Sequence, residues 1–207
     1  MSTTYHTSPF GIAQHPWLNK ADTKYNADGV FKVSLVIGGS EAQAFKDQLD
    51  AEAKAALERF WESDEGKKVA AKDRKSWKVY APYVADTDDE GNETGYFVFR
   101  FKQNQKLKLK DGTTKVLKIG IKDASGKKEV AKPIFGGTEL RVMYTLRDIV
   151  MKSDKQVGVQ LAFGQVQVRK LADTQAGGSF EEVEGYHEAD EDGSSASSPA
   201  TDSGGDY

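Results

Sequence analysis

The sequence contains no cysteine among its 207 residues. Disulfide bonds, zinc–thiolate sites and thiol catalysis are therefore excluded, and we expect a reducing compartment. No apolar run approaches the roughly 20 residues that a membrane-spanning helix requires. The first ten residues also lack the basic start and apolar stretch of a signal peptide. We therefore expect a soluble intracellular protein that does not contact membranes.

The signatures of common enzymes and metal sites are also missing. The three histidines are scattered without the spacing of metal ligands, and no G-x-S-x-G nucleophile motif occurs. Segment 86–97 begins like a calcium-binding loop, but its twelfth position is Phe97, where the loop requires a bidentate Glu. We predict a protein that is not an enzyme and has no catalytic residue, metal or cofactor. A metal-dependent nuclease, with carboxylates assembled from distant residues, is the open alternative.

Positive charge is absent from the last 35 residues, which contain ten acidic side chains and no Lys or Arg. All 29 basic residues and 22 of the 32 acidic residues precede this segment. The net charge of −3 therefore divides into +7 on residues 1–172 and −10 on residues 173–207. Because opposite charges attract, the acidic segment is a candidate internal competitor for any polyanion that the body binds.

Composition divides the chain at the same point. The run SSASSPATDSGG at 194–205 cannot bury enough apolar surface to offset the entropy of ordering it. We therefore expect 173–207 to be a disordered acidic tail that ends in an aromatic residue, Tyr207. Residues 1–172 are enough for one domain with a sizeable core.

The body is mostly patterned as strands. Apolar and polar residues alternate over 31–37, 97–102, 106–110, 117–122, 140–147 and 157–168, as in half-buried strands. Over 40–62 the apolar residues instead recur at helical spacing, after Ser40 with Gln43 as a possible capping box. A phase shift after Gly164 indicates a bulge that bends the last strand. This pattern predicts a mainly β fold, a five-stranded curved oligonucleotide/oligosaccharide-binding (OB) barrel with one inserted helix; a β-sandwich is the alternative.

Basic residues recur on the polar face of the middle strands, and aromatic residues lie near them in sequence. Phosphates require positive charge and exposed bases require flat apolar surfaces, so this combination predicts a binding domain for single-stranded nucleic acid. The plainer interpretation is that lysines solubilise the strands and aromatics fill the core. The candidate charged contacts are Arg100, Lys106, Lys108, Lys118, Lys122 and Arg141. The candidate stacking residues are Trp77, Tyr80, Tyr83 and Tyr96. Trp17 and Tyr144 are weaker candidates, Trp17 because large aromatics outside regular structure often plug barrel ends, and Tyr144 because it alternates in phase with core positions.

Several segments resemble the single-stranded DNA-binding proteins of T7-type and related tailed bacteriophages. They are GVFKVSL at 29–35, PIFGGT at 133–138, LRVMYTL at 140–146, and the acidic C-terminus that closes on Asp206-Tyr207. Together with the Ala- and Glu-rich helical segment, they extend the resemblance over nearly the whole chain.

The resemblance implies an OB fold with a helix inserted between strands, and sequence-independent binding of single-stranded DNA in phage replication and recombination. It also implies a homodimer in the cytoplasm of the infected bacterial host. The acidic tail would occupy the DNA groove when DNA is absent and recruit the replicative DNA polymerase and the helicase-primase or similar proteins. The tail residues expected to take part are Asp190, Glu191, Asp192, Asp202, Asp206 and Tyr207.

Two features depart from the family pattern. The family usually ends on Phe, whereas this chain ends on Tyr207, and segment 147–152 lacks the exposed aromatic residue expected there. The alternatives are an RNA-binding OB-fold protein, or a non-catalytic scaffold module with a solubilising tail. Competition between DNA and RNA oligomers of equal sequence would distinguish the RNA-binding alternative from DNA binding, since only RNA has the 2′-hydroxyl.

Overall fold

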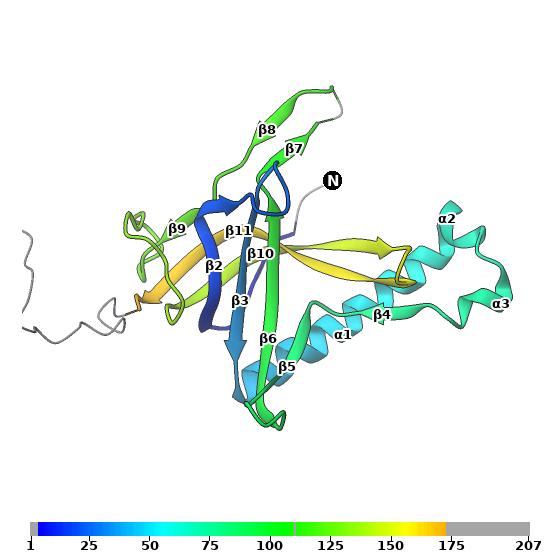
Figure 1. Cartoon of the computed structure of the whole chain (residues 1–207), viewed down its shortest axis with the longest axis horizontal. Helices are drawn as coiled ribbons and strands as arrows, with labels where there is room; N and C mark the ends of the chain where they lie inside the picture. The colour runs from blue at the N-terminus through cyan, green and yellow to red at the C-terminus, as the bar shows by residue number, and fades with distance from the viewer. Residues whose placement is uncertain (1–3, 110, 173–207) are drawn as a thin grey trace, which may run out of the picture. The chain divides into compact units, whose positions relative to one another are not determined.

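The computed structural model of the chain describes residues 4–109 and 111–172 (Figure 1). The expected disorder of the acidic tail, and the roles expected of its residues from Asp190 to Tyr207, lie outside these ranges. The described residues belong to one compact unit.

Five strands pair in a ring. Their bounds are β2 (Gly11–Asp22), β3 (Val30–Ile37), β6 (Glu93–Asn104), β10 (Glu139–Met151) and β11 (Gln156–Lys170). β3 pairs antiparallel with β2 on one side and β6 on the other, and β10 pairs antiparallel with β11. β6 meets β11 in parallel at Phe101 and Leu161, and β10 returns to β2 at Leu140 and Gly11. The predicted mainly β fold, with five strands curved around one core, is confirmed.

Shorter strands extend this ring. β1 (His6–Thr7) pairs with β10, β5 (Tyr83–Thr87) pairs with β6, and both β4 (Lys78–Tyr80) and β9 (Gly120–Lys122) pair in parallel with β11. β7 (Lys106–Lys108) and β8 (Thr114–Val116) pair only with each other and project from the ring as a hairpin (Figure 1).

The inserted helix is α1 (Gly39–Glu62), which confirms the predicted segment; α2 (Asp64–Lys67) and α3 (Ala71–Arg74) follow it. The expected capping box is wrong, because the N-cap is Gly38 and no side chain caps this end. Phe45 of α1 packs against Phe99, with ring centroids 4.6 Å apart. Further along, Ala53 and Ala56 pack on β11, so that α1 and the far ends of β10 and β11 extend together to one side of the ring (Figure 1).

Tyr144 lies in the centre of the core. It is 1% exposed, and its ring packs between those of His6 and Phe101 at centroid distances of 5.5 and 5.7 Å. Burial raises the pKa of its hydroxyl to about 12, with a smaller contribution from the charge of Glu52. No ring face is open to a base, so we withdraw Tyr144 from the stacking residues.

No helix among the described residues is long and apolar enough to cross a membrane.

Candidate nucleic-acid interface

The outward side chains of β3 and β6 form regular rows. Partners across an antiparallel ladder share a face of the sheet, and alternation places Leu35 and Phe99 in the core. Lys32 is therefore beside Lys102 on the outside. β2 adds one residue to each row, which gives Trp17–Lys32–Lys102, Gln14–Ser34–Arg100 and Ile12–Val36–Val98. We call these rows the β3–β6 face.

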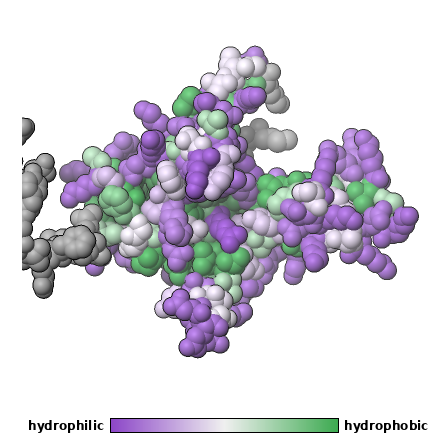
Figure 2. All heavy atoms as spheres, viewed as in Figure 1, coloured by the Kyte–Doolittle hydropathy of each residue, from purple (hydrophilic) through white to green (hydrophobic). Residues whose placement is uncertain are grey.

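The β3–β6 face changes from charged to apolar along its strands. Successive rows are about 7 Å apart, since each strand residue advances roughly 3.3 Å. The row at Lys102 and the row at Arg100 are basic, whereas the row at Val98 is aliphatic and is continued by Val84 of β5. Figure 2 shows mainly hydrophilic residues over β3 and β6, with a hydrophobic strip below them. A nucleotide strand has the same two sides, with charged phosphates on one and bases on the other.

Arg100 and Lys102 are exposed and take part in none of the ion pairs formed by residues 4–109 and 111–172. Lys32, in contrast, is held 2.6 Å from the carboxylate of Asp22. The hydrogen bond from Lys32, aided by the backbone N–H of Lys24, lowers the pKa of Asp22. The face thus has two unpaired cations and a third that a carboxylate restrains.

The loop between β2 and β3 adds an aromatic ring that sequence reasoning missed. Tyr25 is 85% exposed, and the Lys24 ammonium lies 5.1 Å from its ring centroid. A cavity of about 470 Å³ separates Tyr25 from Lys32 and Lys102 of the β3–β6 face. The available signal was a lone aromatic in a polar segment, between Lys24 and Asn26, directly before a strand.

Among the predicted stacking residues, Trp17 and Tyr96 lie on this surface. Trp17 is 41% exposed in the row of Lys32, and Tyr96 is 50% exposed further along β6, where its ring covers Gly38. A side chain at residue 38 would overlap that ring, so the glycine allows it to lie against the backbone.

The other predicted aromatics are placed elsewhere. Tyr83 pairs with Phe99, so its ring turns toward the core, and its hydroxyl donates to Asp50. Burial raises the pKa of Tyr83. Tyr80 is half-buried on β4, and Trp77 packs beside α1 against Phe60, with ring centroids 4.9 Å apart. The structure does not bring these three residues to the β3–β6 face.

The six predicted cations divide between two surfaces. Arg100 lies on the β3–β6 face, while Lys106 and Lys108 lie on the hairpin that continues from β6, and Lys118 follows that hairpin; all four are exposed. Lys106 is 3.2 Å from Asp28 in the loop that carries Tyr25. Lys122 and Arg141 instead lie on the outside of β9 and β10.

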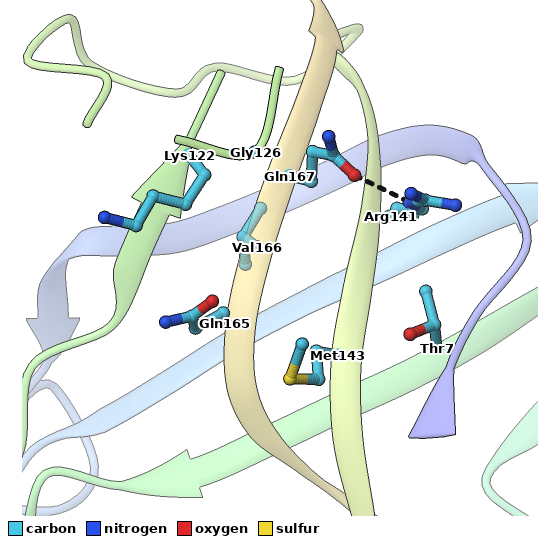
Figure 3. A pocket seen from close by; sticks show the side chains of 8 residues that line it. All are labelled: Thr7, Lys122, Gly126, Arg141, Met143, Gln165, Val166 and Gln167. Atoms are coloured by element: carbon cyan, nitrogen blue, oxygen red, sulfur yellow. Dashed lines mark hydrogen bonds between the residues drawn. The ribbon is translucent and has the colours of Figure 1, made fainter. Parts of the chain in front are cut away.

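These last two cations flank one residue of β11. Gln167 is the strand partner of Lys122 on one side and of Arg141 on the other, and it accepts a hydrogen bond of 2.8 Å from Arg141 Nε (Figure 3). We call this surface the β9–β11–β10 face. Within the described ranges, no group of three or more His, Asp or Glu side chains could hold a metal ion.

Known proteins with similar sequences are single-stranded DNA-binding proteins. The family model "Single-stranded DNA-binding protein, Bacteriophage T7" matches residues 6–171. The single-stranded DNA-binding protein of Enterobacteria phage T3 is 29% identical over 194 residues, which covers 85% of this chain and 80% of the relative.

Solved structures share the fold. The single-stranded DNA-binding protein gp2.5 of bacteriophage T7 matches with a TM-score of 0.65 and 24% identity, covering 91% of this chain and 100% of its own. A single-stranded DNA-binding protein of bacteriophage Enc34, solved with single-stranded DNA, matches with a TM-score of 0.54 and 14% identity over 82% of this chain and 88% of its own.

Proposed function

Because the chain belongs to the family of the bacteriophage T7 single-stranded DNA-binding protein, we propose that it binds single-stranded DNA on the β3–β6 face during phage replication and recombination. The observation that carries the proposal is the pair of unpaired cations, Arg100 and Lys102, on the same face as the exposed ring of Trp17, which lies across Lys32 from Lys102. OB folds bind oligonucleotides on this part of the barrel, the second and third strands of the ring and the loop before the second strand.

The chemistry of the face suits a strand of any sequence. Arg100, Lys102 and Lys32 attract phosphates and release their counterions, while Trp17 and Tyr25 offer flat surfaces for bases. Stacking contributes roughly 1–3 kcal/mol per base and is tolerant of sequence, because every base has a π-face. The hairpin cations Lys106 and Lys108, followed by Lys118, extend the positive surface beyond β6. The protein acts by binding and is not an enzyme.

The acidic tail is the part of the chain that regulates DNA binding in this proposal. The tail has a net charge of −10 and the body +7, so the tail competes with DNA for the positive body and is released when DNA binds. Its released acidic residues and Tyr207 would then recruit the replicative DNA polymerase and the helicase-primase or similar proteins. The protein works as a homodimer in the cytoplasm of the infected bacterial host.

Tryptophan fluorescence tests the binding site directly. The chain has three tryptophans; Trp17 is on the β3–β6 face, whereas Trp61, in the last turn of α1, packs against Trp77 with ring centroids 5.8 Å apart. Oligo(dT) should quench the emission of the wild-type protein and of W77F, but not that of W17F. Quenching that survives in W17F and disappears in W77F would place the bases elsewhere.

The nucleic-acid class is tested by competition. Single-stranded DNA should displace labelled oligo(dT) far better than duplex DNA of the same length, because duplex bases are not free to stack. RNA of equal sequence is the informative third competitor. If RNA competed better than DNA, the proposal of a DNA-binding protein would be replaced by the RNA-binding alternative.

A further inference from the structure

The β9–β11–β10 face carries a second cationic site, separate from the β3–β6 face. A cavity of about 140 Å³ opens there between Lys122 and Arg141 (Figure 3). Its polar lining comes from Thr7, Gln165 and Gln167, and its apolar lining from Met143 and Val166. The two cations and the Gln165 amide therefore border the space, and the partly exposed side chain of Met143 adds an apolar wall.

Arg141 is held in place for an anion. Its guanidinium lies 4.8 Å from the ring centroid of Phe10, and its Nε is fixed by Gln167. A guanidinium has five N–H donors, so four remain after the bond to Gln167. A stacked, hydrogen-bonded guanidinium has already lost much of its side-chain freedom, which lowers the entropic cost of binding a phosphate.

Lys122 can change partner at little cost. Its ammonium is 3.1 Å from a carboxylate oxygen of Glu129, whose side chain is 75% exposed. The Lys122 side chain is 22% exposed, but the Glu129 carboxylate is open to solvent and therefore screened, so a phosphate can replace it. Gln167, between Lys122 and Arg141, keeps the two cations on one side of the sheet.

A basic segment joins the two faces. From the end of β6 the chain passes through the β7–β8 hairpin to β9, and it carries Lys106, Lys108, Lys115, Lys118 and Lys122 along this path (Figure 1). Among the acidic residues near this path, Asp28 pairs with Lys106 and Glu129 pairs with Lys122, while Asp111 and Asp123 accept hydrogen bonds within their own turns.

We infer that the β9–β11–β10 face binds a second stretch of the same nucleic-acid strand, with Lys122 and Arg141 contacting its phosphates. The inference rests on the proposed function. A short oligomer fills the β3–β6 face, and a longer one continues past the hairpin to the second site. Single OB folds contact about 4–16 nucleotides. Oligo(dT) of about 10 nucleotides should therefore occupy the β3–β6 face alone, and oligo(dT) of about 35 nucleotides should reach both faces.

The test compares the double variant K122Q/R141Q with wild type on both oligomers, at several salt concentrations. Binding of the short oligomer should be unchanged. Binding of the long oligomer should weaken, and the slope of log affinity against log salt should fall by about 1.4, since each lost phosphate contact removes about 0.7. R141K, which keeps the charge and loses the bond to Gln167, should retain most of the slope.

The matched control is K72Q/K75Q, which removes two exposed charges at and after α3. It should leave both oligomers unaffected, and thermal unfolding should confirm that every variant is folded. If K122Q/R141Q bound the long oligomer like wild type, the second site would be wrong while the proposed function stood. If wild type failed to bind the short oligomer, the proposed function itself would fail.

Discussion

Lys32 and Lys102 are direct cross-strand partners on the outside of the ring, yet only Lys32 has a carboxylate beside it. Asp22 holds Lys32 at 2.6 Å, whereas Lys102 has no ion-pair partner among the described residues. Two adjacent cations of one row are thus in different states before DNA arrives. In the proposed complex, Lys102 is free to contact a phosphate, whereas Lys32 must first share or leave its carboxylate.

The substitution D22N should therefore strengthen binding of oligo(dT) at neutral pH, with a salt slope steeper by about 0.7 if Lys32 gains one full phosphate contact. The asparagine retains an oxygen for the Lys24 backbone N–H but no charge for Lys32. A fluorescence titration at several salt concentrations measures both effects. D28N, which frees Lys106 in the same way, is the matched comparison. Weaker binding by D22N would show that Asp22 positions Lys32 for DNA rather than restraining it.

The same carboxylate predicts a pH dependence of stability. The pKa of Asp22 is lowered in the folded protein from a usual value of 3.8. A lowered carboxyl pKa contributes stability that is present above the unfolded pKa and is lost as pH falls through the folded value. Wild type should thus be more stable than D22N at pH about 7, with the difference shrinking below pH about 4. Denaturant midpoints at pH values on both sides of 3.8 measure it, and a difference that grew on acidification would contradict the assignment.

The substitution Y25A should weaken oligo(dT) binding by about 5- to 150-fold, the equivalent of roughly 1–3 kcal/mol for one lost stack. Because the side chain is 85% exposed, its removal should leave the unfolding temperature nearly unchanged. Y25F keeps the ring and should bind like wild type. Equal affinities for Y25A and Y25F would remove Tyr25 from the interface.

The substitution G158A should destabilise the fold by about 1–3 kcal/mol, the usual cost of overpacking. A Cβ at residue 158 would overlap the carbonyl oxygen of Tyr80, its partner on β4, so the parallel pairing of β4 with β11 would have to open. G136A, where the added Cβ would have only an ordinary contact with the Ala13 carbonyl, is the control. Thermal unfolding checks both, and a G158A protein as stable as wild type would be the contrary result.

Deletion of residues 173–207 should tighten DNA binding at low salt and reduce its dependence on salt, because a competing polyanion of ten acidic residues is removed. Electrostatic screening should make full-length and tailless proteins converge at high salt. Equilibrium titration of both proteins with oligo(dT) measures the effect. Weaker binding after the deletion would contradict competition by the tail.

Sequence patterns predicted the architecture well where periodicity alone decides it. Alternation identified β3, β6, β10 and β11, and helical spacing identified α1 within one residue of its start. The same periodicity could not tell which side of the ring an outward residue occupies. Arg100 and Arg141 have the same alternating context in sequence, but one lies on the β3–β6 face and the other on the β9–β11–β10 face.

The aromatic residues show the same limit. Trp77 is near the basic strands in sequence, but α1 is 24 residues long and carries the chain away from the ring before β4 brings it back. Tyr83 is also near the basic strands in sequence, yet its hydroxyl donates to Asp50 of α1 and its ring packs against Phe99. Tyr25 was missed because the seven-residue polar loop between β2 and β3 has no periodicity to interpret. Tertiary packing, rather than local pattern, decides which rings remain exposed.

The most direct measurement is the salt dependence of oligo(dT) binding by R100Q/K102Q, with K72Q/K75Q as the charge-matched control. If the β3–β6 face is the interface, R100Q/K102Q should bind more weakly, with a slope reduced by about 1.4, while the control matches wild type. If R100Q/K102Q had the same slope as wild type, DNA binding on the β3–β6 face would be contradicted.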